Sequence, residues 1–227
     1  MVTMYDVVKN FPRPDRSLVE ALGKVQTATL HESMGKRGAF PHYIRPVWPE
    51  CALCGVAFTV KSRPGDNLML HKAVALARPG DVLVVDNEGF VEAGLWGEIV
   101  TIAAMQKGIV GLVTNGAVRD TRQIRDLGFP VFCAGISIKG TTKAVPGKIN
   151  NPISFEGVIV NPGDIVIGDN DGLAAIPCGE AEQVLEAART RETTEAEVIK
   201  KIKEGHSTME LLGFNEAYKR LGLSEEA

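Results

Sequence analysis

The sequence predicts an α/β fold on a parallel sheet, followed by a helical extension at the C-terminal end. Between residues 81 and 135, β-rich runs alternate with helical runs, which is the pattern of a parallel sheet with crossover helices. Residues 154–176 hold short β-rich runs separated by glycine turns, and these favour antiparallel strands. Residues 179–205 predict a long polar helix, of the kind that projects from its own domain and rests on a neighbour.

The composition is that of a soluble protein with a substantial core. The 227 residues suffice for one domain with an appended tail, and 44% of them are hydrophobic. The formal charge of −3 and the pI near 5.9 argue against nucleic acid as a partner. No run approaches the ~18 to 20 apolar residues of a membrane span, and no export signal opens the chain. We therefore expect a cytoplasmic protein with neither a nucleic-acid nor a membrane partner.

The elements that precede the parallel unit follow from capping residues, alternation and prolines. They are helices at 15–25 and 27–38, a loop at 37–50, a strand at 54–62 and a helix at 66–77. Asp66 is the expected N-cap of the last of these helices.

The parallel unit and the segments after it complete the prediction. Strands are expected at 81–86, 109–114 and 130–135, and helices at 94–108, 121–128, 179–205 and about 207–221. Asn115 and Gly116 are expected to form a turn after the second strand. We expect an α/β domain at 1–178 and a C-terminal helical extension at 179–227 that packs on a neighbouring subunit.

Two smaller features have structural explanations. The segments 77–87 and 160–172 share Pro-Gly-Asp before a β-rich run, which predicts a repeated turn rather than a repeated site, because Gly accepts positive φ. The four cysteines lack a second pair at zinc-site spacing. We expect them to be reduced and mostly buried: Cys51, Cys54, Cys133 and Cys178.

The candidate site follows from the parallel crossover. Ligands of open α/β sheets bind outside the carboxyl ends of the strands, so the loops after 81–86 and 109–114 should meet at one edge. This brings Gly97 and Glu98, at a helix start, close to Arg119 and Asp120. The free amides at the helix start and the planar guanidinium group of Arg119 would bind a carboxylate. Asp120 and Glu98 supply the oxygen ligands that Mg²⁺ or Mn²⁺ prefers. The set therefore suggests an α-keto acid bound beside a hydrated divalent ion.

Simpler interpretations stay open for each of these residues taken alone. Arg119 and Asp120 could form a solvated ion pair, and Glu98 is expected in a first helical turn without any metal. His31 does not open an H-E-x-x-H motif, and His71 suits a packing or capping role. The run at 168–172 resembles part of a calcium loop but is better interpreted as a turn.

The segment LWGEIVTIAAMQKGIVGLVTNGAVRD (95–120) resembles the signature of the RraA-like superfamily. The segments at 65–74 and 31–47 are similar to the metal-dependent pyruvate aldolases within it. These are the 4-hydroxy-4-methyl-2-oxoglutarate / 4-carboxy-4-hydroxy-2-oxoadipate aldolases of aromatic-acid breakdown. The resemblance covers most of the chain and implies a layered α/β sandwich of the swivelling β/α/β type, assembled as homotrimers or homohexamers.

The resemblance also implies roles for single residues. Asp120 would be the direct ligand of the divalent ion, and Glu98 would hold metal-bound water. Arg119 would bind the carboxylate and carbonyl end of the substrate, and the amides around Gly97, Glu98 and Ile99 would bind the pyruvyl carboxylate. Glu195, with Glu192 as the second choice, would reach a neighbouring subunit's metal-water shell. The chain departs from the family pattern at three positions: Glu98 stands where Asp is frequent, and Asn115 and Gln123 stand where acidic residues are frequent.

The implied activity is a class II retro-aldol cleavage that releases pyruvate, with oxaloacetate decarboxylation as a side reaction. In it the ion polarises the 2-keto oxygen, a metal-linked or site-ordered water takes the C4 hydroxyl proton, and the metal and Arg119 hold the enolate. A non-catalytic regulator that binds a ribonuclease and a keto-acid lyase with another substrate are the alternatives. Lys36, Arg37 and His42 could recognise a distal carboxylate or form a solvated basic loop.

Overall fold

The computed structural model describes residues 6–155 and 157–223. The chain divides into two compact units, Met1–Leu185 and Glu186–Ala227, and each is described by itself. The first unit holds the sheets and the candidate site, and the second holds most of the long helix and the helices after it.

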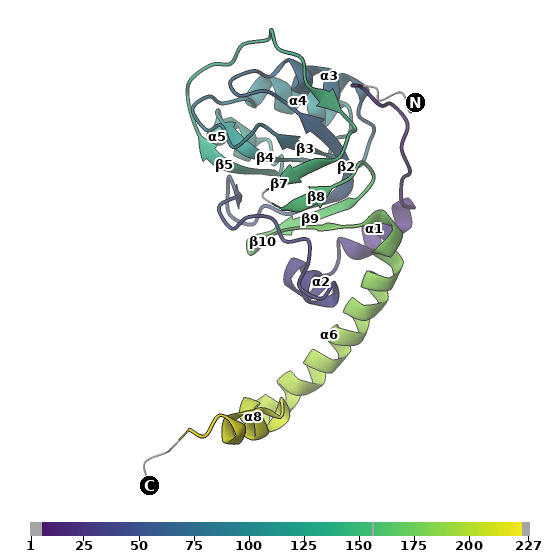
Figure 1. Ribbon diagram of the computed structural model, residues 1–227, viewed down its shortest axis with the longest axis vertical. Coiled ribbons are helices and arrows are strands. Elements are labelled where there is room, and N and C mark those ends of the chain that lie inside the picture. The colour runs from purple at the N-terminus through teal and green to yellow at the C-terminus, as the bar shows by residue number, and fades with distance from the viewer. Residues whose placement is uncertain (1–5, 156, 224–227) are drawn as a thin grey trace. The chain divides into compact units, whose positions relative to one another are not determined.

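A mixed eight-stranded sheet forms the centre of the first unit (Figure 1). Its order is β1-β5-β4-β3-β2-β9-β10, with β6 paired to β2, and β2 to β5 are mutually parallel. The strands are β1 (Arg45–Pro46), β2 (Leu53–Lys61), β3 (Asp81–Asp86), β4 (Gly111–Val118), β5 (Val131–Ile136), β6 (Lys148–Ile149), β9 (Ile165–Asp169) and β10 (Gly172–Ile176). A separate hairpin pairs β7 (Ile153–Phe155) with β8 (Val158–Val160). The predicted α/β class is thus confirmed.

Both faces of the parallel strands are buried, and their side chains alternate between two cores. Leu83 and Val85 join one cluster, which α3 (Leu68–Leu76), α4 (Glu98–Gln106) and α5 (Thr121–Asp126) cover. Val82 and Val84 join the other, which the β7–β8 hairpin covers. Figure 1 shows α3, α4 and α5 together on one side of β3–β5, with α1 (Arg16–Leu22) and α2 (Thr27–Ser33) near β9 and β10. This layering follows from the two-residue period of strands with two apolar faces.

The repeated Pro-Gly-Asp segments form equivalent turns. Gly80 and Gly163 adopt φ of 87° and 96°, a conformation that glycine takes at no steric cost. In each copy the Asp carboxylate accepts a backbone hydrogen bond from three residues earlier, at 2.8 Å: Arg78 N–H to Asp81, and Asn161 N–H to Asp164. The repeat is therefore structural, because each copy forms the turn that precedes a strand.

Three local predictions were wrong. Asn115 and Gly116 lie inside β4, which continues to Val118, because a register shift between Thr114 and Ala117 absorbs them. Asn67, not Asp66, occupies the N-cap of α3, although Asp66 Oδ1 still accepts the Leu68 N–H at 2.9 Å.

The last predicted helix, at 207–221, is two helices. These are α7 (Thr208–Leu211) and α8 (Phe214–Arg220), separated at Gly213, whose φ of 70° a continuous helix does not allow.

The four cysteines are free thiols, as expected. Burial raises the pKa of Cys51 to about 11, that of Cys54 to about 12 and that of Cys133 to about 11. A raised pKa keeps a thiol protonated and poorly nucleophilic at neutral pH. These side chains therefore act as small hydrophobic groups.

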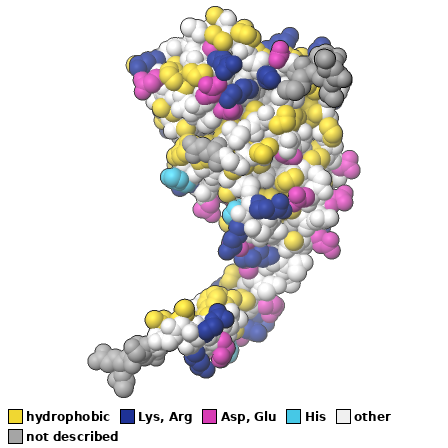
Figure 2. Space-filling view, viewed as in Figure 1, with side chains coloured by type: hydrophobic (Ala, Val, Ile, Leu, Met, Phe, Trp, Pro, Cys, Tyr) yellow, Lys and Arg dark blue, Asp and Glu magenta, His cyan; other side chains and the backbone are white. Residues whose placement is uncertain are grey.

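The polar helix predicted at 179–205 is α6 (Ala181–Lys203), preceded by a 3₁₀ turn (Cys178–Glu180). In the second unit apolar side chains on the last turns of α6 and on the helices after it are exposed, and Figure 2 shows them gathered there: Ile199, Ile202, Leu212, Phe214, Leu221 and Leu223. In the described part of the chain, no helix has both the length and the apolar character that crossing a membrane requires.

Candidate functional site

A cavity of about 360 Å³ lies at the carboxyl-terminal edge of the parallel strands. Its walls come from the start of α3, the segment that leads into α4, the residues after β4 and the loop after β5. They are Asn67, His71, Gly94, Leu95, Trp96, Gly97, Ile99, Val100, Arg119, Asp120, Gly140, Thr141 and Lys143. The predicted edge therefore carries the cavity that contains the predicted Arg-Asp pair.

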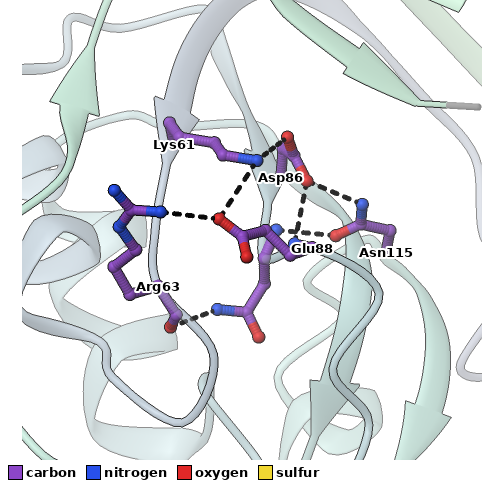
Figure 3. A network of polar contacts seen from close by, with 6 residues as sticks. Lys61, Arg63, Asp86, Glu88 and Asn115 are labelled. Atoms are coloured by element: carbon purple, nitrogen blue, oxygen red, sulfur yellow. Dashed lines mark hydrogen bonds and ion pairs between the residues drawn. The ribbon is translucent and has the colours of Figure 1, made fainter.

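A polar network joins the ends of β2 and β3 to the irregular part of β4 (Figure 3). Asn115 Nδ2 donates to Asp86 Oδ1 at 2.9 Å, and Asn115 Oδ1 accepts the Asn87 N–H at 2.7 Å. Lys61 Nζ lies 2.5 Å from Asp86 Oδ2 and so neutralises a carboxylate that is only 6% exposed. Because Lys61 and Asp86 end β2 and β3, the network ties the irregular part of β4 to its neighbours.

Beyond this irregularity, β4 places Arg119 and Asp120 against the segment that leads into α4. Leu95 N–H donates to Ala117 O, and Arg119 N–H donates to Trp96 O, both at 2.9 Å. Asp120 adopts a left-handed conformation, with φ 55° and ψ 37°, before α5 begins. Non-glycine residues in this region are uncommon, and Asp is among those that tolerate it.

The Asp120 carboxylate and the start of α4 are in contact. Glu98 N–H donates to Asp120 Oδ2 at 3.0 Å, and Arg119 Nε lies 3.9 Å from the same oxygen. A Cβ atom on Gly97 would collide with Asp120 Oδ2, so only glycine allows this approach. Asp120 Oδ1 accepts no hydrogen bond from the residues that the structure describes.

The α4 N-terminus offers an anion site beside this carboxylate. The first amides of a helix have no carbonyl partner within it, and here the Glu98 amide is used by Asp120. The amides of Ile99 and Val100 follow it in the first turn. Thr101 Oγ1 donates to Gly97 O at 2.9 Å and accepts from Trp96 Nε1 at 2.7 Å, which fixes the helix start.

Another part of the cavity wall is polar and partly cationic. Asn67 and His71 lie one turn apart on α3, and Lys143 comes from the loop after β5. Asn67 Nδ2 donates to Leu95 O at 2.9 Å, whereas its buried Oδ1 has no partner among the described residues. Partial burial, and secondarily the Lys143 ammonium, lower the pKa of His71 below its ordinary value, which favours the neutral imidazole at neutral pH.

The oxygen chemistry of this edge suits a hard divalent ion with a small protein ligand set. No group of three or more His, Cys, Asp or Glu side chains arranged to hold a metal occurs in residues 6–155 and 157–223. Mg²⁺ commonly takes one or two carboxylates and keeps several waters, so a full protein cage is not required. The open Oδ1 of Asp120, with Glu98 beginning the adjacent helix, fits that requirement.

The sequence-predicted residues divide into two groups. Gly97, Ile99, Arg119 and Asp120 line the cavity, and Glu98 joins them through its backbone. Glu195 lies on α6 in the second unit, with Oε1 2.7 Å from Arg191 Nε.

The basic loop after α2 does not line this cavity. Arg37 pairs with Glu180 at 2.7 Å, and neither Lys36 nor His42 is among the lining residues. In a single described chain, these residues are therefore separate from the site.

Sequence reasoning missed the wall formed by Asn67, His71, Thr141 and Lys143. Two of these had a usable signal, because Asn67 and His71 are four residues apart and so share a helix face. His71 lines the cavity instead of packing into the core. Lys143 had no such signal, since its loop has no periodicity.

Comparisons with known proteins identify the family of this chain. A family model described as RraA-like, Aldolase/RraA, matches residues 27–174. Over 149 residues the chain is 42% identical to a Halalkalibacterium halodurans protein named "Putative 4-hydroxy-4-methyl-2-oxoglutarate aldolase", and the match covers 66% of this chain and 71% of that protein.

Solved structures show the same fold. An uncharacterized protein from Pseudomonas syringae pv. tomato matches with a TM-score of 0.78 and 27% identity, over 88% of this chain and 99% of that one. RraAS2 of Streptomyces coelicolor, described as an unusual member of the RNase ES inhibitor RraA family, matches with a TM-score of 0.75 and 29% identity, over 83% of this chain and all of that one. The chain belongs to the RraA-like (Aldolase/RraA) family.

Proposed function

We propose that this protein is a divalent-metal-dependent pyruvate aldolase. It would cleave 4-hydroxy-4-methyl-2-oxoglutarate or 4-carboxy-4-hydroxy-2-oxoadipate to pyruvate and a second keto acid, with oxaloacetate decarboxylation as a side reaction. The observation that carries the proposal is the meeting of Arg119, Asp120 and the α4 N-terminus in one wall of the cavity. The similarity to a protein named as such an aldolase supports it.

Asp120 would hold the Mg²⁺ or Mn²⁺ directly, with Glu98 binding its water. Bound there, the ion supplies Lewis-acid polarisation of the substrate's 2-keto oxygen. Arg119 would bind the keto and carboxylate oxygens of the pyruvyl group through its planar fork. The amides of Ile99 and Val100 lie at the positive end of the α4 dipole and would donate hydrogen bonds to the same carboxylate. Together these groups stabilise the negative charge that develops on the pyruvyl oxygens as the C3–C4 bond breaks.

The polar wall suits the other end of the substrate. Lys143 provides a cation for a second carboxylate, and Asn67 and His71 provide hydrogen-bonding groups between the two ends. The lowered pKa of His71 keeps its imidazole neutral, so one ring nitrogen can accept a proton or hydrogen bond from a substrate hydroxyl. Leu95 and Trp96, both 1% exposed, form the apolar floor that limits water around the reacting bond.

A neighbouring subunit would complete the site. Ile99, Ile136 and Ile138 lie beside Arg119 and Asp120 and are 79%, 66% and 91% exposed, which is unusual for isoleucine unless another chain covers it. We place Glu195 of an adjacent copy, with Glu192 as the second choice, near the metal-water shell. The assembly would be a homotrimer or homohexamer.

The alternative is a non-catalytic regulator that binds a ribonuclease. The likeness to RraAS2, described as belonging to a ribonuclease-inhibitor family, is the observation that favours it. The presence of both Arg119 and Asp120 in a cavity that Lys143 also lines favours the enzyme.

The test is pyruvate release by the full-length chain, coupled to lactate dehydrogenase. We expect Mg²⁺-dependent pyruvate from 4-hydroxy-4-methyl-2-oxoglutarate and a slower release from oxaloacetate. Release from oxaloacetate alone would indicate a related keto-acid lyase with another substrate. Failure with both substrates, together with inhibition of a ribonuclease by the same preparation, would support the regulator and reject the aldolase.

A further inference from the structure

Asp66 is a buried carboxylate that joins two walls of the cavity. Its residue surface is 1% exposed, and it lies just before α3. Oδ1 accepts the Leu68 N–H at 2.9 Å, at the first turn of that helix. Oδ2 accepts three donors from the loop after β5: Thr142 Oγ1 at 2.7 Å, Ala144 N at 2.6 Å and Val145 N at 3.2 Å.

The loop that Asp66 holds is anchored at its start by Lys139, whose carbonyl accepts the Gly94 N–H at 3.0 Å and whose Nζ lies 2.5 Å from Glu92 Oε2. Residues 138–140 and 142–146 are exposed, so little apolar burial fixes them. Backbone bonds connect Thr142 N–H to Gly65 O at 2.8 Å and Asn67 N–H to Thr142 O at 3.1 Å. Both sit directly beside Asp66, whose carboxylate is therefore the centre of the attachment.

The two joined segments carry different parts of the cavity wall. Asn67 and His71 stand on the α3 side, and Thr141 and Lys143 stand on the loop side. A change at Asp66 would leave Arg119 and Asp120 in place, because these are fixed by β4 and α4. It would instead alter where Lys143 stands relative to them.

We propose that Asp66 is a positioning residue, which fastens residues 142–145 of the loop after β5 to the start of α3 and thereby fixes Lys143 in the wall of the cavity that Arg119 also lines. Its kinetic consequence rests on the proposed aldolase function, whereas its effect on the loop does not. Asp66 touches no substrate. By holding the Lys143 ammonium at one distance from Arg119, Asp66 favours substrates that carry a second carboxylate at the matching distance from their keto-acid end.

Capping of α3 alone would not explain this arrangement. A cap needs one acceptor for the first helical amides, and Oδ1 supplies it. The three donors on Oδ2 all come from another segment of the chain, and their hydrogen bonds are stronger to a charged oxygen than to a neutral one. In Asp66→Asn an amide NH₂ must face one of these donor groups, whichever way the side chain turns.

The experiment compares wild type, Asp66→Asn and Asp164→Asn by hydrogen exchange of the full-length chain. Asp164 is the matched control, because it is 5% exposed, accepts backbone N–H groups in a turn and lies outside the cavity lining. We expect the Ala144 and Val145 amides to exchange about tenfold faster or more in Asp66→Asn, since a hydrogen bond to a charged group is stronger than one to a neutral group. In Asp164→Asn their exchange should equal that of wild type.

The kinetic arm uses the same proteins and 4-hydroxy-4-methyl-2-oxoglutarate. Asp66→Asn should raise KM about tenfold, with kcat changed much less, because a misplaced Lys143 weakens binding without moving the keto-acid end. Asp164→Asn should leave both constants as in wild type. If wild type releases no pyruvate, the aldolase proposal fails while the exchange comparison still decides the role of Asp66.

Unchanged exchange at Ala144 and Val145 in Asp66→Asn would overturn the proposal, as would an equal acceleration in Asp164→Asn. If Asp66→Asn does not fold, Thr142→Val removes one donor to Oδ2 and leaves the cap of α3 intact. Trypsin cleavage after Lys143 should then be faster than in wild type, and an unchanged cleavage rate would reject the attachment.

Discussion

The backbone N–H of Glu98 donates a hydrogen bond of 3.0 Å to Asp120 Oδ2, across 22 positions of sequence. One carboxylate oxygen is thus used to hold the start of α4 against the residues after β4. The other oxygen, Oδ1, accepts no hydrogen bond from the residues that the structure describes and can therefore bind a ligand. In the proposed function, a single Asp would therefore both order the site and bind the metal.

Gly97→Ala tests the closeness of that contact. The added Cβ would collide with Asp120 Oδ2, so the carboxylate must turn away from α4. We expect loss of most Mg²⁺-dependent pyruvate release, measured with the lactate dehydrogenase assay. Gly179→Ala is the control, because nothing lies within 4 Å of its added Cβ. A Gly97→Ala protein with wild-type activity would show that the Asp120 position is not critical.

Arg119→Lys tests whether the planar guanidinium group of Arg119 binds the substrate through paired donors. A lysine keeps the charge but loses the paired donors, so the substrate's keto and carboxylate oxygens should bind less well. We expect kcat/KM for pyruvate release to fall about 10- to 100-fold, equivalent to ~1.5–3 kcal/mol for a charged hydrogen bond. Arg122→Lys, on the exposed face of α5, should leave kcat/KM as in wild type. Equal effects of the two substitutions would argue against a binding role for Arg119.

Asn115→Asp tests the network behind the site. The substitution places a carboxylate where an amide now donates to Asp86 at 2.9 Å (Figure 3). Mutual repulsion raises the pKa of the pair, so the variant should be destabilised at neutral pH by about 1–3 kcal/mol. The loss should shrink as the pH falls and one carboxyl becomes protonated. Urea unfolding of both proteins at pH 7 and pH 5 measures it, and a loss of stability that does not depend on pH would contradict the repulsion.

The pH dependence of stability tests Asp66 independently of activity. Burial raises the pKa of its carboxyl, but hydrogen bonds from Ala144, Leu68, Thr142 and Val145 outweigh burial and leave the pKa below the ordinary 3.8. A folded-state pKa that is lowered contributes stability that is present above the ordinary pKa and is lost as the pH falls through the folded value.

The free energy of unfolding of Asp66→Asn should therefore differ most from wild type at pH 6–7, by about 1–3 kcal/mol. The difference should narrow below pH 3.8, as the wild-type carboxyl is protonated. Denaturant titrations at several pH values measure both curves. A difference that stays constant down to low pH would mean that the negative charge contributes nothing.

The sequence predicted the sheet edge and the pair Arg119–Asp120 because both depend on local patterns and on the handedness of parallel crossovers. It did not predict that Asn115 and Gly116 stay within β4. Their turn propensity is local, whereas the Asn115 bonds to Asp86 and to the Asn87 N–H come from a neighbouring strand and the residue after it. Tertiary hydrogen bonding here outweighs turn propensity.

The polar wall could be predicted only in part, for the same reason. Asn67 and His71 share a helix face, and that much was readable from their spacing. That this face meets Lys143 depends on the Asp66 attachment, which joins residues 76 to 79 positions apart. Single-sequence patterns do not contain contacts at that separation.

The most direct test of the account is the Mg²⁺ dependence of pyruvate release from 4-hydroxy-4-methyl-2-oxoglutarate, for metal-stripped wild type and Asp120→Asn side by side. Asp126→Asn, an exposed acid on α5, is the control. The account predicts saturable activation of wild type and Asp126→Asn, and a rate at least about 10³-fold lower for Asp120→Asn at any Mg²⁺ concentration, since Lewis-acid stabilisation is worth several kcal/mol. Equal wild-type rates in Mg²⁺ and in EDTA, or an Asp120→Asn protein that follows the wild-type curve, would contradict it.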